Sequence, residues 1–313
     1  MKGIELSKRY YEAFGKPMLE EQFGAFVGVI AVGLVGSGSE CFGYDDEISQ
    51  DHDFEPGFCL FLPGESIVDR KIAFQLERAY AKLPSEFMGF RRAPLSPVGG
   101  NRHGVLRMGD FLLEKTGTPD GAMSLLDWFS VPEQSLAEAT NGEIFRDDLG
   151  WFTETRQRLS YFPEDVRLKK LAGNLLLMGQ AGQYNFARCI RRGDRAAAQL
   201  AAGEFVTSAL RAIFLLNRKY LPYYKWQFRA LTELEKLSSL YVDLEAILTG
   251  ENTDVAAREK QQRIDRVCKS VTDEVCTEGL SSYHGDAMEG YAHSINDNIA
   301  DATLRNQHVL FGV

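Results

Sequence analysis

An apolar run rich in β-branched residues, VIAVGLV at residues 29–35, constrains the fold more than any other feature of the chain. A continuous run of this length is typical of a β-strand that is buried on both faces. The wider apolar stretch at 23–36 is too short to cross a membrane, since a spanning helix needs about 20 apolar residues. A loop of glycines and serines follows the run, and six acidic residues lie between positions 40 and 53. The run therefore predicts a buried strand that leads into a small-residue loop and a group of carboxylates.

Strand and helix signals alternate in the first half of the chain. Helices are expected at 4–22 (with a break at Pro17), 66–83 and 109–117, and strands at 51–63 (with a break at Pro56-Gly57) and 103–108. Because strands and helices follow one another in this order, we predict an α/β or α+β domain over residues 1–155.

Residues 156–313 show the apolar period of a helix over long stretches. The clearest helix is expected at 194–220, where Asp194 is suited to cap an alanine- and leucine-rich body. The segment GENTDVAAREK, at 250–260, supplies a loop and a further helix start. We therefore expect a second domain over residues 156–313, an all-α helical bundle packed with the first domain.

Composition argues against several classes of protein. The net charge of −9 and the pI of about 5.2 leave no basic face for extensive contact with nucleic acid, although a small basic pocket remains compatible. The five cysteines form no CxxC pair, which argues against a disulfide framework or a zinc finger. The N-terminus has no apolar signal-peptide segment, so we expect a cytoplasmic protein that contacts no membrane.

Asp51 and Asp53 are the residues with the clearest chemistry. One residue apart at the start of a predicted strand, they point to the same face, and a divalent cation would relieve their mutual repulsion. Mg²⁺ is the natural occupant, because it takes one or two protein carboxylates and completes its shell with water and substrate phosphates. The alternatives are an acidic surface turn and a calcium loop, although the EF-hand spacing is absent.

Gly38 and Ser39 follow the predicted buried strand. Glycine allows backbone N–H groups to approach a polyphosphate closely, and the serine hydroxyl can add a hydrogen bond. This loop and the aspartates together predict a site for a metal–nucleotide complex.

The pattern resembles the nucleotidyltransferase superfamily that includes DNA polymerase β and the aminoglycoside nucleotidyltransferases. Its members have a Gly-Ser pair after a strand, commonly a glycine four residues later, and Asp-x-Asp or Asp-x-Glu on the next strand. The matching residues are Gly38, Ser39, Gly43, Asp51 and Asp53, with Ser49 before the first aspartate and Gly36-Ser37 as the second choice for the pair. The resemblance covers residues 25–65 strictly and the first half loosely, and it indicates a bacterial branch distinct from the known resistance enzymes.

The resemblance implies that the Gly-Ser loop binds a nucleoside triphosphate, with ATP as the expected donor. Asp51 and Asp53 would hold Mg²⁺ at the α-phosphate, and a nucleoside monophosphate would pass to an acceptor hydroxyl or similar group on a small molecule, with release of pyrophosphate. The helical half resembles the substrate domain of antibiotic-type members, in which a lysine on a Tyr/Lys-Trp helix contacts the phosphates. In YLPYYKW (220–226) this lysine is Lys225. The nucleotide is then expected between the two domains.

One departure from the family pattern keeps other functions open. The superfamily often has a third carboxylate on a following strand. The candidate strand here, HGVLRM (103–108), has Arg107 and no acid. The acids that could take the place of the third carboxylate are Glu40, Asp110, Asp127 and Glu133. Without a third acid, the chain could be a catalytically inactive nucleotide-binding regulatory or antitoxin-like protein. A nucleotidyltransferase acting on tRNA or on a protein, and a structural interaction protein, are further alternatives.

A polar run in the helical half is a candidate acceptor pocket. It contains Gln183, Tyr184, Asn185 and Arg188, just after an apolar helix. The alternative is a helix with a solvated basic face. For the aromatic residues of YLPYYKW, core packing and stacking on a nucleobase or acceptor are equally open.

Overall fold

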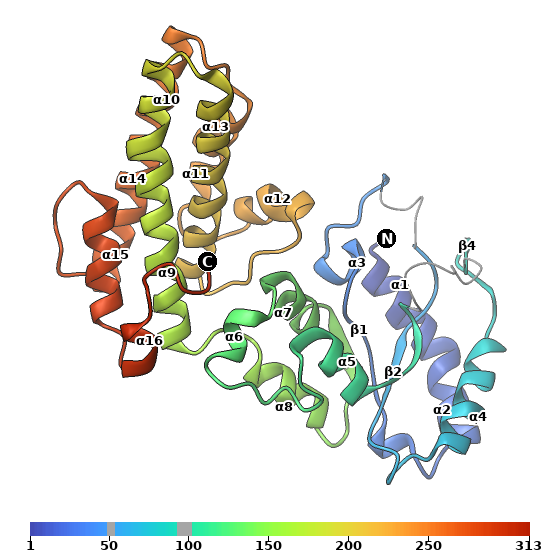
Figure 1. Ribbon diagram of the computed structural model, residues 1–313. Helices are drawn as coiled ribbons and strands as arrows, with labels where there is room; N and C mark the ends of the chain where they lie inside the picture. Colours follow the sequence, from blue (N-terminus) through green and yellow to red (C-terminus); the bar gives the residue numbers. More distant parts are fainter. Residues whose placement is uncertain (49–53, 93–101) are drawn as a thin grey trace. The chain divides into compact units, whose positions relative to one another are not determined.

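Two units make up the chain in the computed structural model, which describes residues 1–48, 54–92 and 102–313. Unit 1 contains Met1–Asp127 and Val131–Ser160, and unit 2 contains Trp128–Ser130 and Tyr161–Val313 (Figure 1). The sequence predicted a division after residue 155, whereas the chain passes into unit 2 after Ser160. Trp128 belongs to unit 2 because its ring packs against Phe162, with 5.8 Å between the ring centroids.

Unit 1 is built on a four-stranded mixed sheet with the strand order β5-β2-β1-β6. Its strands are β1 (Ala31–Leu34), β2 (Cys59–Leu62), β5 (Gly104–Arg107) and β6 (Glu143–Arg146). β1 pairs antiparallel with β2 and β6, and β2 pairs parallel with β5. The C-terminal end of β1 therefore lies at the same end of the sheet as the N-terminal ends of the other three strands. We call this end of the sheet the loop edge; the residues there that directly flank the strands are Val35, Phe58, His103 and Gly142.

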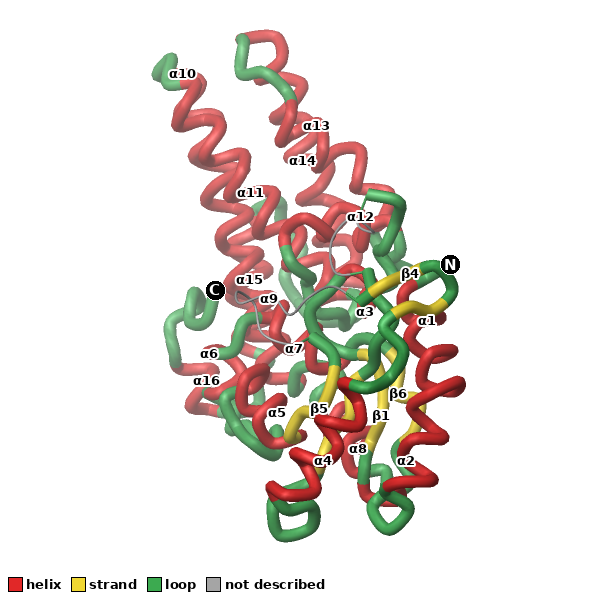
Figure 2. The backbone as a smooth tube through the Cα atoms, turned by 90° about the vertical axis from the view of Figure 1, so that its right-hand side faces the viewer, coloured by secondary structure: helices red, strands yellow, loops and turns green. Residues whose placement is uncertain are grey.

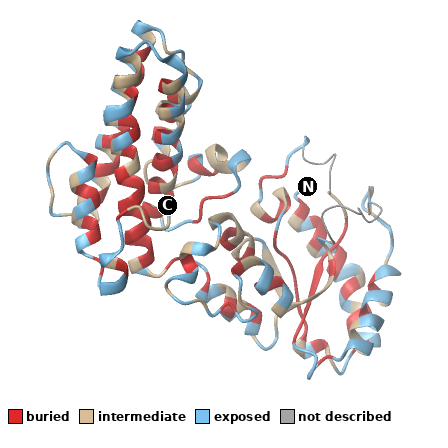
Figure 3. Ribbon diagram, in the orientation of Figure 1, coloured by how far each residue is buried: buried red, intermediate tan, exposed pale blue. Residues whose placement is uncertain are grey.

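Helices cover both faces of this sheet (Figure 2). Val32, Leu60 and Leu62 pack in one core with α1 (Gly3–Tyr10), α2 (Lys16–Gln22) and α4 (Arg70–Ala81). On the other face, Phe61 contacts Phe111 of α5 (Met108–Thr116) and Phe152 of α8 (Trp151–Arg158), with centroid distances of 5.3 and 4.3 Å. Because side chains alternate along a strand, both faces of β1 and β2 are buried, as the apolar run predicted (Figure 3).

The remaining elements of unit 1 are short. A two-stranded sheet pairs β3 (Glu86–Phe87) with β4 (Phe90–Arg91), and the helices α3 (Ser39–Phe42) and α7 (Glu133–Thr140) lie in the connections. The short helix α6 (Asp127–Ser130) begins in unit 1, and its last three residues belong to unit 2. Val27–Val29 forms a 3₁₀ turn before β1.

The predicted break at Pro17 is wrong. The first helical segment continues from α1 through a π-helical turn at Tyr11–Gly15 into α2, where Pro17 occupies the first turn. Proline is tolerated there because the N–H it lacks is not required at a helix start. The predicted strand at 103–108 and helix at 109–117 are confirmed, and the helix is closed by Gly117 with a φ of +79°.

Unit 2, all of whose residues are described, consists of helices and loops. Its elements are α9 (Glu164–Met178), the π-helix η4 (Gly179–Phe186), α10 (Ala187–Arg191), α11 (Arg195–Leu216), η5 (Tyr224–Trp226), α12 (Gln227–Thr232), η6 (Ser238–Leu240), α13 (Tyr241–Thr249), α14 (Asp254–Thr277), α15 (Met288–Asp297) and α16 (Ala302–Asn306). Asp194 caps α11 as predicted, because its Oδ1 accepts a hydrogen bond from Ala197 N at 2.9 Å.

Helix α11 is the center of the unit 2 core and packs against α9, α13 and α14. By length and composition it could cross a membrane, but 61% of its apolar window is buried inside the protein. Burial of this kind is the pattern of a core helix and is compatible with a soluble protein.

Candidate functional site

The small-residue loop after β1 adopts a backbone that only glycine accepts readily. Gly36 has a φ of +114° and Gly38 a φ of +132°, both in the region that disfavours any residue with a Cβ. The N–H groups of Ser37, Gly38 and Ser39 form no hydrogen bond within the described part of the chain. Three consecutive N–H groups without an internal acceptor can receive the oxygens of an anion. The pair predicted as first choice, Gly38-Ser39, and the second choice, Gly36-Ser37, thus belong to one loop.

Asn141 holds this loop in place. Gly36 N donates to Asn141 Oδ1 at 2.9 Å, and Asn141 Nδ2 donates to Gly36 O at 2.8 Å. The next residue, Gly142, has a φ of +68°, and its N–H donates to Cys41 O at 2.9 Å. Sequence reasoning missed both residues, although an Asn-Gly pair in front of β6 is a known turn signal. The two hydrogen bonds fix the start of the loop against the edge strand β6.

The far end of the loop is tied to the first residues of the chain. Gly3 N donates to Asp45 Oδ2 at 2.9 Å, and Lys2 Nζ donates to Asp45 O at 2.6 Å and to Gly43 O at 3.0 Å. Gly43 ends α3 with a φ of +72°. These contacts bury Asp45, so its carboxylate stabilises the loop and is not part of a solvated acidic surface.

The predicted metal ligands Asp51 and Asp53, with His52 and Ser49, lie outside the described residues. Within the part of the chain that the structure describes, no group of three His, Cys, Asp or Glu side chains could hold a metal ion. The magnesium site therefore remains a prediction from the sequence.

A carboxyl group and a histidine lie next to the loop instead. Glu40, in α3, is 7% exposed, and its Oε1 has no hydrogen-bond partner in the described structure. Burial raises the pKa of the Glu40 carboxyl, while its own backbone N–H and the nearby His103 and Arg102 oppose that rise. At the start of β5, His103 Nδ1 lies 3.2 Å from Glu55 Oε1. Sequence reasoning had no signal for this pair, because 48 positions separate its members.

The other candidates for a third acid lie elsewhere. Arg107, at the C-terminal end of β5, donates to Pro63 O at 2.7 Å and to Val68 O at 2.6 Å, so it closes a loop at the opposite edge of the sheet. Asp110 follows it in the first turn of α5, on that same side. Asp127 accepts a hydrogen bond from Ser124 N at 2.7 Å. Glu40 is the candidate that the structure places beside the glycine loop.

Lys225 lies in unit 2, in a segment that we call the aromatic loop (218–235). The two ends of this loop are joined by Asn217, whose Nδ2 donates to Lys236 O at 3.0 Å and whose Oδ1 accepts from Lys236 N at 2.9 Å. The loop exposes Tyr223, Tyr224 and Lys225, and Tyr224 is 70% exposed. Lys225 Nζ lies 5.0 Å from the centroid of the Trp226 ring. The rings of Tyr223 and Tyr224 are therefore exposed and available for stacking, whereas Tyr220 is buried against Tyr161 and Phe162.

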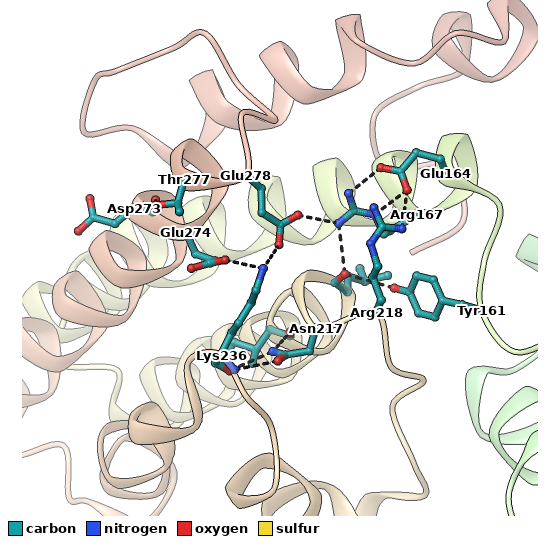
Figure 4. A network of polar contacts seen from close by, with 12 residues as sticks. Tyr161, Glu164, Arg167, Asn217, Arg218, Lys236, Asp273, Glu274, Thr277 and Glu278 are labelled. Atoms are coloured by element: carbon teal, nitrogen blue, oxygen red, sulfur yellow. Dashed lines mark hydrogen bonds and ion pairs between the residues drawn. The ribbon is translucent and has the colours of Figure 1, made fainter.

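An ion-pair network supports the base of the aromatic loop (Figure 4). Lys236 Nζ lies 2.7 Å from Glu278 Oε1 and also pairs with Glu274. Arg167 is fully buried, and it donates to Glu164 Oε1 at 2.6 Å and to Glu278 Oε2 at 3.3 Å. A buried guanidinium is costly unless it is paired, so these contacts bind the N-terminal end of α9 to the C-terminal end of α14. The C-terminal end of the loop is thereby anchored to α14 through Lys236.

The four residues of the candidate acceptor pocket form two separate sets of contacts. Gln183 Nε2 donates to Asp286 O at 2.9 Å, and Gln183 Oε1 accepts from Met288 N at 3.1 Å, so this amide holds the start of α15. Tyr184 and Arg188 pair with each other, the guanidinium lying 4.5 Å from the ring centroid. Asn185 is exposed. All four lie on or next to the π-helix η4, a kind of distortion that is frequent at functional sites.

Comparison with known proteins adds one partial match. A family described as a domain of unknown function (DUF4037) matches residues 128–227, a segment that includes α9, η4, α10, α11 and Lys225. No curated protein and no solved structure matches the chain. The chain is thus similar to this family over less than half of its length, and the match names no activity.

Proposed function

We propose that the protein is a Mg²⁺-dependent nucleotidyltransferase. It transfers a nucleoside monophosphate, AMP from ATP as the expected case, to a hydroxyl or similar group on a small molecule and releases pyrophosphate. The observation that carries the proposal is the loop Gly36–Ser39, which follows the buried strand β1. It has two positive-φ glycines and three N–H groups that form no hydrogen bond with any described residue. The order strand, loop, strand, helix and strand (β1, β2, α4, β5) also agrees with the core to which the sequence is similar.

In this proposal the N–H groups of the loop receive the β- and γ-phosphates, and the hydroxyls of Ser37 and Ser39 add hydrogen bonds. Asp51 and Asp53 hold Mg²⁺, which neutralises charge on the α-phosphate and orients the attacking group in line. Carboxylates are the ligand type that Mg²⁺ prefers, and β2 begins at Cys59, a few residues after Asp53 in the sequence. Lys225 keeps the role that the resemblance implies, a positive charge for the phosphates. A cytoplasmic location and the absence of a membrane partner belong to the same proposal, while tRNA stays an alternative acceptor.

The test is transfer of label from α-labelled ATP in the presence of MgCl₂ and a low-molecular-mass cell extract. Wild type should label a small molecule, and Asp53→Asn should abolish Mg²⁺-dependent labelling while the fold stays intact. Asp46→Asn is the matched control, because Asp46 is an exposed acid a few residues upstream, and it should keep full activity. Full activity of Asp53→Asn would contradict the metal site. Label on protein or tRNA would redirect the proposal to a macromolecular acceptor.

The loop itself is tested by Gly38→Ala. A Cβ at Gly38 would lie 2.4 Å from Glu40 Oε1, at a φ that other residues avoid. We expect a loss of stability of about 1–3 kcal/mol from this strained backbone and a weaker affinity for Mg–ATP in equilibrium titration. Unchanged affinity would show that the loop does not hold the phosphates.

A second candidate function is nucleotide binding without turnover, in a regulatory or antitoxin-like protein. The lack of a carboxylate in β5, Gly104–Arg107, favours it. This function would be identified if the protein binds ATP but releases no pyrophosphate, whichever nucleoside triphosphate and whichever fraction of the extract is added.

A further inference from the structure

A histidine and a glutamate meet at the loop edge, next to the start of β5, the strand that carries no acid. His103 directly precedes β5, and Glu55 precedes β2, so the parallel pairing of these strands brings the two side chains together. Gly104 N donates to Phe58 O at 2.9 Å, which fixes the register beside them. The contact between His103 Nδ1 and Glu55 Oε1 is 3.2 Å.

The imidazole ring is held in one orientation. Its atoms pack so closely on Gly57 that a Cβ at that position would lie 2.6 Å from His103 Nδ1. The side chain of His103 is only 9% exposed. The other ring nitrogen, Nε2, forms no hydrogen bond with the described residues. The ring therefore binds Glu55 through Nδ1 and not through Nε2.

This arrangement sets the chemistry of the ring. A carboxylate that accepts a hydrogen bond from Nδ1–H selects the tautomer whose Nε2 carries a lone pair, and it stabilises the imidazolium that forms when Nε2 takes a proton. Among the described residues, the carboxyl groups of Glu55, in front of β2, and Glu40, in α3, interact with the His103 ring.

We propose that His103 is the general base of the nucleotidyl transfer and that Glu55 is its positioning residue, an inference that rests on the function proposed above. His103 Nε2 takes the proton of the acceptor O–H group. The acceptor oxygen forms a bond with the α-phosphorus of the nucleoside triphosphate, and the bond from that phosphorus to the β-phosphate oxygen breaks. Pyrophosphate leaves with the bonding electrons, and the imidazolium then releases its proton to water. His103 and Glu55 thus supply the general base that a carboxylate on β5 would supply in other members of the family.

The test compares His103→Asn, Glu55→Gln and a control in the labelling assay with α-labelled ATP, MgCl₂ and the low-molecular-mass extract, over a range of pH. Asparagine keeps a hydrogen-bond donor near the Nδ1 position and removes the base at Nε2. The matched control is His293→Asn, since His293 is an exposed histidine that also lies near a glutamate, Glu289, at 3.7 Å. His103→Gln is the second variant if His103→Asn does not fold.

In wild type we expect the rate to rise with pH along an acid limb and then to level off, because a general base must be unprotonated to accept a proton. His103→Asn should lower kcat by roughly 10²- to 10⁴-fold, keep the Kd for Mg–ATP within about 2-fold and lose the acid limb of the profile. Glu55→Gln should lower kcat and keep the Kd for Mg–ATP within about 2-fold, because the ring loses the carboxylate that selects its tautomer. A merely structural role for His103 would leave the shape of the pH profile unchanged.

Two negative results are distinguishable. If wild type transfers label but His103→Asn keeps kcat within about 3-fold and the same acid limb, the general-base role is overturned and the proposed function stands. If wild type transfers no label, the proposed function fails and this inference fails with it.

Discussion

Replacement of Asn141 tests whether the glycine loop is fixed by the two hydrogen bonds that Asn141 forms with Gly36. Asn141→Ala removes both bonds, which measure 2.9 and 2.8 Å and are partly buried. A typical intramolecular hydrogen bond contributes about 0.5–1.5 kcal/mol net, so the loop should lose about 1–3 kcal/mol of local stability. Asn141→Asp is the graded variant, since it keeps the acceptor for Gly36 N–H and loses the donor to Gly36 O.

Hydrogen exchange measured by mass spectrometry is the suitable assay, because it reports the opening of one segment rather than of the whole chain. A loss of 1–3 kcal/mol corresponds to exchange that is roughly 5- to 150-fold faster in peptides covering 33–40, and Asn141→Asp should fall between Ala and wild type. Peptides from unit 2 should exchange at the wild-type rate. If peptides covering 33–40 exchange at the wild-type rate in Asn141→Ala, the hydrogen bonds do not hold the loop and the reasoning is refuted.

Two further predictions concern unit 2. Asn217→Ala removes the two hydrogen bonds that join Asn217 to Lys236. Limited proteolysis should therefore cleave the aromatic loop (218–235) faster than in wild type. Equal cleavage rates would show that the loop is fixed by other contacts. Burial alone would raise the pKa of Glu164, but hydrogen bonds from Arg167 and Arg218 lower it below its ordinary value of 4.5. Its contribution to stability is therefore present above that value and is lost as the pH falls through the folded-state pKa, so unit 2 should lose stability in acid. Glu164→Gln should flatten this dependence in denaturation curves recorded from pH 6 down to about pH 3, and an unchanged slope would contradict the ion pair.

Local patterns were sufficient to predict several elements of the fold. The β-branched run gave β1, and Asp194 marked the start of α11, because burial of a strand and capping of a helix depend on adjacent residues. The helix through Pro17 was misjudged because a proline in the first turn of a helix resembles a break when only the sequence is read. Strand β6 was missed, since all four of its residues are half-buried and it lies at the edge of the sheet.

Contacts between distant segments were beyond the reach of sequence reasoning. The Gly36–Asn141 hydrogen bonds span 105 positions, and the Glu55–His103 contact spans 48. Such contacts depend on which strands pair and in which register, and no local periodicity specifies that choice. The glycine loop could be predicted, because glycines after a buried strand are a local signal, but the residues that fix it could not.

The most direct test of the central claim compares ATP labelled at the α-phosphate with ATP labelled at the γ-phosphate, each incubated with wild-type protein, MgCl₂ and the low-molecular-mass extract. A nucleotidyltransferase leaves the α-label on the acceptor and releases the γ-label as pyrophosphate. The account predicts a small-molecule product labelled from the α-position alone, formed in amounts equal to the pyrophosphate released. A product labelled from the γ-position, or binding of ATP with no labelled product from either, would contradict it.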